Sequence, residues 1–245
     1  MEGGRRVELR FLGRGAAFFP SEGNTAAYIR EGNRLLLLDC GETVFARLLN
    51  RGVLAGVREV YAAISHLHGD HCGSLGSLAL YCFFQLGFPM TVIMPDGQDA
   101  YAADLGRLLT LFGVRDAYYR QIPAGEVKGF SAFTRFSYVP TVHDPAMTCF
   151  SFVFDTPRGG VFYSADTCRT DELAAFLSSH PQPEALYVEA TDADYPGNIH
   201  LTLDRLAAAV PRAWMERTYV MHLNGPQCAQ KAREMGFSIV PVDAK

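Results

Sequence analysis

The 245-residue chain lacks the features that mark membrane proteins and small secreted domains. No stretch approaches the roughly 18 consecutive apolar residues of a spanning helix, and the N-terminus has no apolar segment of the secretory type. The six cysteines form neither a Cys-x-x-Cys pair nor a dense framework, so we expect them to be reduced. These absences predict a cytoplasmic protein with no membrane partner.

An excess of positive charge is also absent, because the formal net charge at pH 7 is −4. Binding to nucleic-acid backbones depends on clustered Lys and Arg, so we expect no stable nucleic-acid partner and favour a small substrate. No flexible linker, low-complexity block or internal repeat divides the chain. With 49% hydrophobic residues it can bury one core, and we expect a single domain over residues 1–245.

Strand-like and helix-like segments alternate along the chain. We expect strands at 7–12, 25–30, 34–39, 60–65, 90–94, 130–136, 149–154, 161–164, 186–189, 218–221 and 238–242. We expect helices at 43–50, 73–85, 98–112, 171–178, 202–210 and 226–235, with Thr202 as an N-cap. Periodicity alone supports an α/β fold with a buried sheet.

Metal-binding chemistry is concentrated in the hexapeptide His-Leu-His-Gly-Asp-His, residues 66–71, on a loop after a strand-like segment. Imidazoles and carboxylates are the usual ligands of zinc, whereas no packing requirement would gather them here. Alternation directs His66 and His68 to one side and Asp70 to another. The neighbouring side chains of Asp70 and His71 diverge as well, so we expect two metal positions. A chance cluster in a solvated loop is the alternative, which a total of seven histidines disfavours.

Further ligand types follow other strand-like segments, where the scaffold can fix their geometry. These residues are His143, Asp166 and His222. His180 lies instead in a polar, proline-rich stretch, and we expect it at the surface. Cys72 and Cys168 lie beside candidate ligands, and we expect both to support the ligands from behind or to serve packing, not to bind metal.

In this order the candidate ligands resemble the metallo-β-lactamase superfamily, in which His-x-His-x-Asp-His is followed by a distant His, an Asp and a last His. Segments 11–15, 38–42, 163–167, 188–191 and 199–202 are similar to the ribonuclease Z and cyclic-nucleotide phosphodiesterase branch. Segments 65–78, 11–15 and 22–25 resemble the phage-type anti-Pycsar proteins. That family hydrolyses cyclic nucleotide signals, notably pyrimidine ones, and so disarms bacterial defence; a phage-encoded member would act in the host cytoplasm.

The resemblance implies the four-layer αββα sandwich of the superfamily and a dinuclear site. The family roles place His66, His68 and His143 on one divalent metal, Asp70, His71 and His222 on the other, and Asp166 between both. Zinc suits these ligands, and manganese also accepts the oxygen donors. Asp39, which ends a Leu-rich strand, is expected to fix the tautomer of a ligand histidine.

Two adjacent cations would activate a water for attack on phosphorus, and Asp70 would orient it. The leaving alkoxide needs a proton, for which His200 is the candidate general acid, with Glu189 holding its other nitrogen. In the ribonuclease Z branch a Glu and a His at the matching positions act as such a pair. The alternative for His200 is an exposed turn residue at a helix start.

Base recognition is less defined by the sequence. Candidates for stacking are Phe18, Phe19, Tyr195 and the segment Asp116–Arg120, although such residues, taken singly, more often serve packing. The apolar segment Leu75–Phe84 predicts a buried helix or a subunit contact, and the resemblance also implies a homodimer.

The predicted function is hydrolysis of cyclic mononucleotides by a dinuclear phosphodiesterase. Three alternatives remain. The first is transfer-RNA 3′ processing, against which stand the acidic net charge and the lack of a basic, Gly/Pro-rich arm. The second is hydrolysis of a lactone, thioester or β-lactam, and the third is a catalytically silent metal-binding module.

Overall fold

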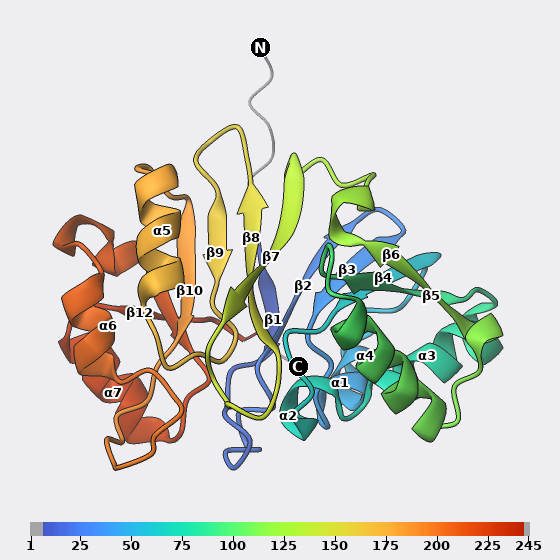
Figure 1. Cartoon of the computed structure of the whole chain (residues 1–245), viewed down its shortest axis with the longest axis horizontal. Helices are drawn as coiled ribbons and strands as arrows, with labels where there is room; N and C mark the ends of the chain where they lie inside the picture. Colours follow the sequence, from blue (N-terminus) through green and yellow to red (C-terminus); the bar gives the residue numbers. More distant parts are fainter. Residues whose placement is uncertain (1–6, 243–245) are drawn as a thin grey trace.

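The computed structural model describes residues 7–242, in which two six-stranded sheets face each other (Figure 1). The first sheet has the order β1 (Arg10–Gly13), β2 (Ala26–Glu31), β3 (Arg34–Leu38), β4 (Glu59–Ala63), β5 (Met90–Met94), β6 (Tyr119–Pro123). The second has the order β12 (Ser238–Ile239), β11 (Thr218–Met221), β10 (Ala185–Glu189), β9 (Val161–Tyr163), β8 (Cys149–Asp155), β7 (Arg135–Thr141). In each sheet the first three strands in sequence are antiparallel and the later ones are parallel.

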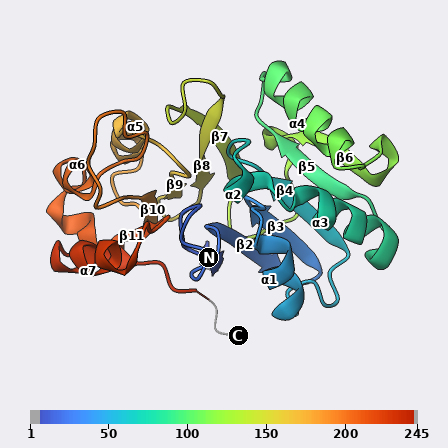
Figure 2. The same ribbon diagram turned by 90° about the horizontal axis from the view of Figure 1, so that it is seen from below.

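Helices cover the outer face of each sheet, as the view from below shows (Figure 2). Beside the first sheet lie α1 (Val44–Asn50), α3 (Leu75–Tyr81), which continues as the π-helical segment η1 (Cys82–Leu86), and α4 (Asp99–Leu111). Beside the second lie α5 (Asp171–Ser179), α6 (Leu203–Ala209) and α7 (Pro226–Glu234). The short helix α2 (Gly69–Cys72) lies at the end of the strands, and short 3-10 turns η2 (Asp116–Tyr118), η3 (Ala124–Glu126) and η4 (Arg212–Arg217) complete the connections.

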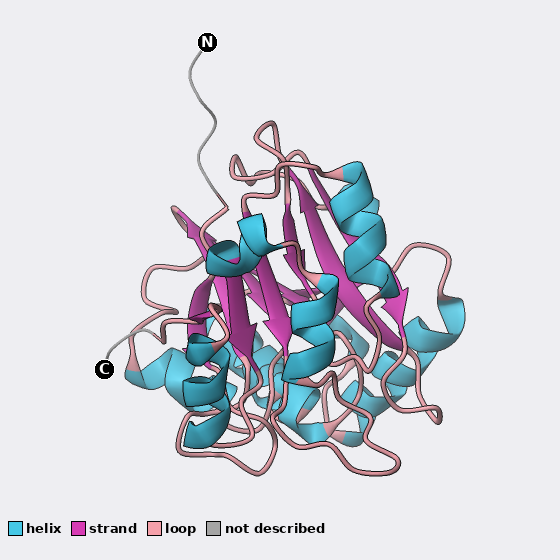
Figure 3. Cartoon of the chain, turned by 90° about the vertical axis from the view of Figure 1, so that its left-hand side faces the viewer, coloured by secondary structure: helices cyan, strands magenta, loops and turns pink. Residues whose placement is uncertain are grey.

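Each strand that is buried on both faces contributes to two hydrophobic layers. In β3, Leu35 and Leu37 pack against the helices, whereas Leu36 and Leu38 face the layer between the sheets. Such strands read as continuous apolar runs because neither face meets water. From the side of the second sheet, helices lie in front of the strands (Figure 3). The layer order is the predicted αββα sandwich.

Several expected elements are confirmed and others are shifted. Thr202 is the N-cap of α6, because its Oγ1 accepts a hydrogen bond from Arg205 N at 3.3 Å. The strand expected at 130–136 is wrong: β7 begins at Arg135, and Phe130 and Phe133 instead pack as stacked rings in a loop, with centroids 5.5 Å apart. These two side chains are apolar because they pack in the hydrophobic core, although their backbone forms no strand.

Strand β6 was not expected, because it lies at the edge of its sheet and is largely exposed, so no apolar alternation marks it. Among the described helices, none is long and apolar enough to cross a membrane. All six cysteines are free thiols.

Candidate metal centre

Buried polar side chains gather at one end of the paired sheets, where the chain leaves the carboxyl ends of strands. Ligand sites commonly form at this edge, because neighbouring strands deliver several connections to one place. The residues are Asp39 after β3, His66–His71 after β4, His143 after β7, Asp166 after β9, Glu189 at the end of β10 and His222 after β11.

Strained backbone is concentrated at the same edge. The described non-glycine residues with positive φ are Asp39 (63°), Ala165 (49°) and His222 (56°), and each closely follows the end of a strand. A left-handed conformation costs a residue with a Cβ about 1–2 kcal/mol. The surrounding contacts must offset that strain, which is the pattern expected where the backbone is shaped to aim side chains at a site.

Three imidazoles form the first ligand group. His66 Nε2 lies 3.0 Å from His68 Nδ1, and His143 Nε2 lies 3.3 Å from the same His68 nitrogen. These ring nitrogens come from two connections that are far apart in sequence, and all lie within 4.8 Å of one another. Three converging imidazole nitrogens match the protein ligands of a tetrahedral zinc with one open position.

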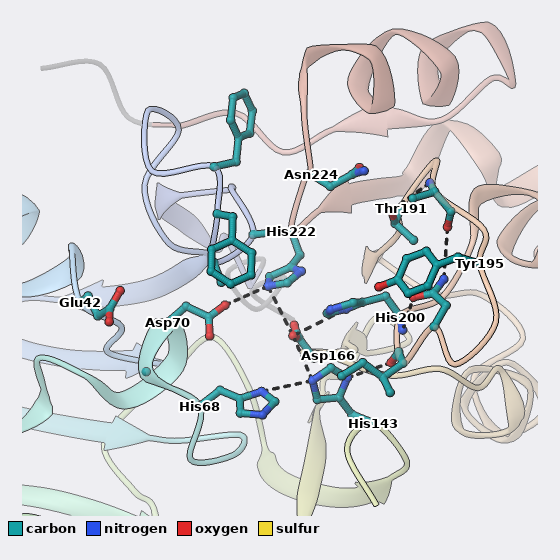
Figure 4. Close-up of a pocket in the computed structure, with 18 residues that line it drawn as sticks. Glu42, His68, Asp70, His143, Asp166, Thr191, Tyr195, His200, His222 and Asn224 are labelled. Carbon is teal, nitrogen blue, oxygen red and sulfur yellow. Dashed lines mark hydrogen bonds and ion pairs between the residues drawn. The ribbon is translucent and has the colours of Figure 1, made fainter.

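Two carboxylates and two imidazoles form the second group. His222 Nε2 lies 3.2 Å from Asp70 Oδ2 and 3.3 Å from Asp166 Oδ2 (Figure 4). His71 Nε2 lies 3.2 Å from Asp166 Oδ1. Asp166 also approaches the first group, since its Oδ2 is 3.6 Å from His143 Nε2. One carboxylate therefore lies between both groups.

The sequence predicts a loop for residues 66–71, but the structure differs. His66 and His68 lie in the connection after β4, but Asp70 and His71 belong to the short helix α2. The helical turn separates the two pairs of side chains, so that His66 and His68 face one group and Asp70 and His71 the other. The two groups of side chains are therefore separate in space, and a helix causes this, not strand alternation; that each group binds a metal stays a prediction.

In each candidate ligand histidine, the ring nitrogen that points away from the ligand group contacts a side chain or carbonyl that can fix the orientation of the ring. Fixing one nitrogen determines which tautomer is present and presents the other nitrogen's lone pair to a cation. The contacts are His66 Nδ1 to Ser65 Oγ at 3.0 Å, His68 Nε2 to Asp144 Oδ2 at 3.4 Å, His71 Nδ1 to Asp39 Oδ2 at 2.9 Å, His143 Nδ1 to Ile199 O at 2.8 Å and His222 Nδ1 to Glu189 Oε2 at 3.5 Å.

Asp39 is the most deeply placed of these partners and is fully buried. Its Oδ1 accepts a hydrogen bond from Ser65 N–H at 2.7 Å, while Oδ2 lies 2.9 Å from both Ser65 Oγ and His71 Nδ1. The carboxylate is thus in the position expected from the sequence; its orienting role stays a prediction. Ser65 and Asp144 were not expected, and their only sequence signal is that each adjoins a candidate ligand.

The electrostatics of the second group favour positive charge. Burial raises the pKa of Asp166, but His222 and His71 outweigh it and hold that pKa well below its usual range. Burial lowers the pKa of His222, yet Asp166, Asp70 and Glu189 raise it to about 10. Buried carboxylates need a compensating charge, and a divalent cation can supply it in place of protons on histidines.

Two inner atoms of this group have no hydrogen-bond partner among the described residues. They are His71 Nε2 and Asp166 Oδ1; both are buried, and they lie 3.2 Å apart without the geometry of a hydrogen bond. A buried polar atom that lacks a hydrogen bond costs about 1–3 kcal/mol, and coordination of both atoms to a shared cation would remove that cost. The donor set, the held outer nitrogens and these two atoms together fit a metal site.

Glu189 and His200 form a pair beside the ligand groups. The fully buried Glu189 carboxylate lies 2.9 Å from His200 Nδ1, and it also accepts a hydrogen bond from Thr167 N–H at 2.5 Å. The His200 ring is 4.8 Å from that of His143, and its Nε2 has no hydrogen-bond partner among the described residues. His200 is therefore held in the site and is not the exposed turn residue of the alternative interpretation.

The pair changes the acidity of His200. Burial lowers its pKa, but the charge and hydrogen bond of Glu189, with a further contribution from Asp166, outweigh burial and raise that pKa above its usual value. A proton is therefore retained on His200 to higher pH than on an isolated histidine. This is the property that a general acid needs near neutrality.

A cavity of about 620 Å³ opens onto both groups, which is within the usual size range of small-molecule sites. His68, Asp70, His143, Asp166, His200 and His222 line it, and Phe18, Phe19 and Tyr195 also belong to its lining. Among the described residues that line it there is no Lys or Arg. None of the residues of the candidate segment Asp116–Arg120 lines this cavity, and Tyr118 packs instead on Phe83, with ring centroids 4.2 Å apart.

The fold and the order of the candidate ligands are those of the metallo-β-lactamase fold. Among solved structures, the metallo-β-lactamase fold protein YhfI from Bacillus subtilis is similar, with a TM-score of 0.72, 18% identity and 94% coverage of both chains. The short form of human tRNase Z has a TM-score of 0.67, 18% identity and 96% coverage of both chains. At these identities the likeness shows the fold.

The sequence comparison identifies the family. A family model described as anti-Pycsar protein Apyc1 matches residues 7–240, and the chain belongs to that family. The anti-Pycsar protein Apyc1 of Saccharibacillus brassicae is 28% identical over 240 residues, which cover 94% of this chain and 96% of that protein. The family resemblance expected from the sequence is confirmed.

Proposed function

We propose that the chain is a metal-dependent phosphodiesterase that hydrolyses cyclic mononucleotides, with pyrimidine cyclic nucleotides of bacterial defence signalling as its biological substrates. The observation that carries this proposal is the Glu189–His200 pair on the wall of a cavity that both ligand groups share. A proton donor placed there suits the poor alkoxide leaving group of a cyclic phosphodiester, the departing ribose oxygen. Membership of the anti-Pycsar protein Apyc1 family supports the same class of substrate.

The proposed metal ligands are those expected from the sequence. His66, His68 and His143 would hold one divalent cation, Asp70, His71 and His222 a second, and Asp166 would contact both. We propose zinc, with manganese as the alternative for the oxygen-rich position. When bound, such a pair of cations supplies an activated water and neutralises phosphate charge.

We propose that side chains on two sides of the cavity transfer the protons of the reaction. The Asp70 carboxylate, 3.2 Å from His222 Nε2, would orient the water and accept its proton. His200 would donate a proton from Nε2 to the departing ribose oxygen, while Glu189 fixes its Nδ1. Because the His200 ring lies 4.8 Å from that of His143 and 5.2 Å from that of His222, the donated proton would be delivered beside both ligand groups.

The size and charge of the cavity favour a mononucleotide over a long RNA. A volume of about 620 Å³ suits a small ligand. Because no Lys or Arg lies among its described lining residues, a polynucleotide would find no contacts there for its flanking phosphates. A transfer-RNA processing activity would need a basic surface outside the cavity.

A direct competition of substrates tests the proposed function. Protein loaded with Zn²⁺ or Mn²⁺ would be incubated separately with the cyclic mononucleotides of cytosine, uracil, adenine and guanine, with a precursor transfer RNA and with a lactone. We expect opening of the cyclic phosphates, fastest for the pyrimidine compounds, and none of the other reactions. Cleavage of the precursor RNA alone would overturn the proposal.

We also propose that residues 1–245 form one hydrolase domain, that it works in the cytoplasm, and that it assembles as a homodimer. The dimer proposal rests on an apolar surface at the end of α3 and α4, where Phe84 and Leu111 are 61% and 76% exposed. Phe84 packs on Tyr118, with centroids 5.1 Å apart. Phe84→Ser combined with Leu111→Ser should convert a dimer to a monomer in light scattering; a monomeric wild-type mass would exclude the dimer.

A further inference from the structure

Two aromatic rings are exposed where they line the cavity. Phe18, in the connection between β1 and β2, is fully exposed, and Tyr195, in the connection between β10 and α6, is 54% exposed. Burial of a Phe side chain normally contributes about 1.5–3 kcal/mol to folding, and Phe18 contributes none of it. These rings therefore contribute little to the core, although both lie at the candidate site.

The exposure of Phe18 does not come from a loosely held loop. Ala16 N donates a hydrogen bond to Leu223 O at 2.9 Å, Phe19 N donates to Ala16 O at 3.0 Å, and Glu22 N donates to Phe19 O at 3.2 Å. The neighbouring Phe19 side chain packs against the hydrophobic layer of the second sheet. The backbone on both sides of Phe18 is thus anchored, and it presents the ring outward.

Tyr195 belongs to a turn that also positions the proposed acid. Asn198 N donates to Tyr195 O at 3.1 Å, and Asn198 Oδ1 accepts from His200 N at 3.0 Å. Asn198 Nδ2 closes the same turn onto Ala193 O at 3.2 Å. Tyr195 lies near His200 and on the opposite side of the pocket from Asp70 (Figure 4).

We infer that Phe18 and Tyr195 are the nucleobase-binding residues of the cavity and that both rings stack on the base of the substrate. This inference rests on the proposed function, because it requires a nucleotide whose phosphate lies at the ligand groups. The same two connections also contribute small side chains to the lining of the cavity, those of Ala16, Ala17 and Ala193. Stacking accepts any base because every base has a π face, so this contact recognises a nucleobase without choosing among bases.

Binding of two ligands that differ only in the base tests the inference. Calorimetric titration of metal-loaded protein would compare cytidine 5′-monophosphate with ribose 5-phosphate. Stacking on one aromatic ring is worth about tenfold or more in affinity, so we expect the nucleotide to bind about a hundredfold more tightly. Phe18→Ala and Tyr195→Ala should each remove about tenfold of that difference and leave the affinity for ribose 5-phosphate unchanged.

Two controls separate a lost ring from a disturbed loop. Tyr195→Phe keeps the ring and should retain wild-type affinity for the nucleotide, and Leu49→Ala, an exposed apolar residue on α1, should change neither affinity. Equal wild-type affinity for both ligands, or an equal loss for both in Phe18→Ala, would overturn the stacking contact.

Turnover of cyclic nucleotides by the wild-type protein is measured alongside and reports on the proposed function alone. Base-dependent binding without turnover would overturn the proposed function while supporting the aromatic contact. Turnover combined with equal binding of the two ligands would overturn the aromatic contact alone.

Discussion

Replacement of His200 by Ala tests the assignment of the proton donor. His200 Nδ1 lies 3.8 Å from Asp166 Oδ2 and is hydrogen-bonded instead to Glu189, at 2.9 Å from Oε2. Its side chain is 25% exposed, so its removal leaves no large buried void. The buried Glu189 carboxylate keeps its hydrogen bond from Thr167 N–H at 2.5 Å. We therefore expect the folded structure and the metal content of the variant to be unchanged.

The expected loss lies in the chemical step. A positioned general acid contributes about 10²- to 10⁴-fold to a rate, which corresponds to about 2.7–5.4 kcal/mol of transition-state stabilisation. For a cyclic nucleotide, kcat of His200→Ala should fall by that factor while KM changes little. For bis(p-nitrophenyl) phosphate, whose leaving group departs without a proton, the loss should be much smaller.

Steady-state kinetics on both substrates, together with metal analysis of the same samples, provide the assay. An equal loss on the two substrates would refute the role of His200 as an acid. Loss of bound metal in His200→Ala would make the residue part of the ligand scaffold instead. The matched variant His180→Ala, which removes a histidine hydrogen-bonded to Asp155 outside the lining of the cavity, should retain wild-type rates.

Three further predictions concern pH, ligand orientation and metal removal. Glu189 raises the pKa of His200, so the protonated acid is present below that pKa and is lost as the pH rises through it. In Glu189→Gln the basic limb of the kcat–pH profile should therefore move to lower pH. A limb that does not move would contradict the pairing of Glu189 with His200. Asp144→Asn removes the carboxylate near His68 Nε2 and should weaken binding of one metal equivalent by about 10- to 100-fold in a competition titration with a chelating dye, whereas Asp171→Asn on α5 should not. Removal of the metals with a chelator should lower Tm, and Tm should recover when Zn²⁺ is added back; a Tm that ignores both steps would indicate no site coupled to folding.

The sequence predicted those parts of the fold in which local pattern and burial agree. The run of Leu residues in β3 indicates a strand that is buried on both faces, and Thr202 indicates the start of a helix. Phe130 and Phe133 led to a wrong strand prediction, because they fill the core from a loop. Glu31 holds that loop by accepting hydrogen bonds from Ser131 N at 2.8 Å and Ala132 N at 2.9 Å. Tertiary contacts of this kind leave no periodic signal.

The candidate site was predictable to the extent that its residues carry costly chemistry at strand ends. Histidines and aspartates in the connections after β4, β7, β9 and β11 have no better explanation than a shared site, and the structure brings them together. The partners that hold the rings are less visible, since Ser65 and the carbonyl of Ile199 are common groups. The helical turn of α2 was also hidden, because four residues are too few for a helical pattern.

The central claim is that this chain holds two divalent cations side by side, and metal analysis of protein purified without chelators tests it most directly. We expect two equivalents of zinc or manganese per chain after reconstitution, falling by one equivalent in His66→Ala and by one in His71→Ala, with the fold retained in both variants. A wild-type protein that binds no divalent metal before or after reconstitution would contradict the claim.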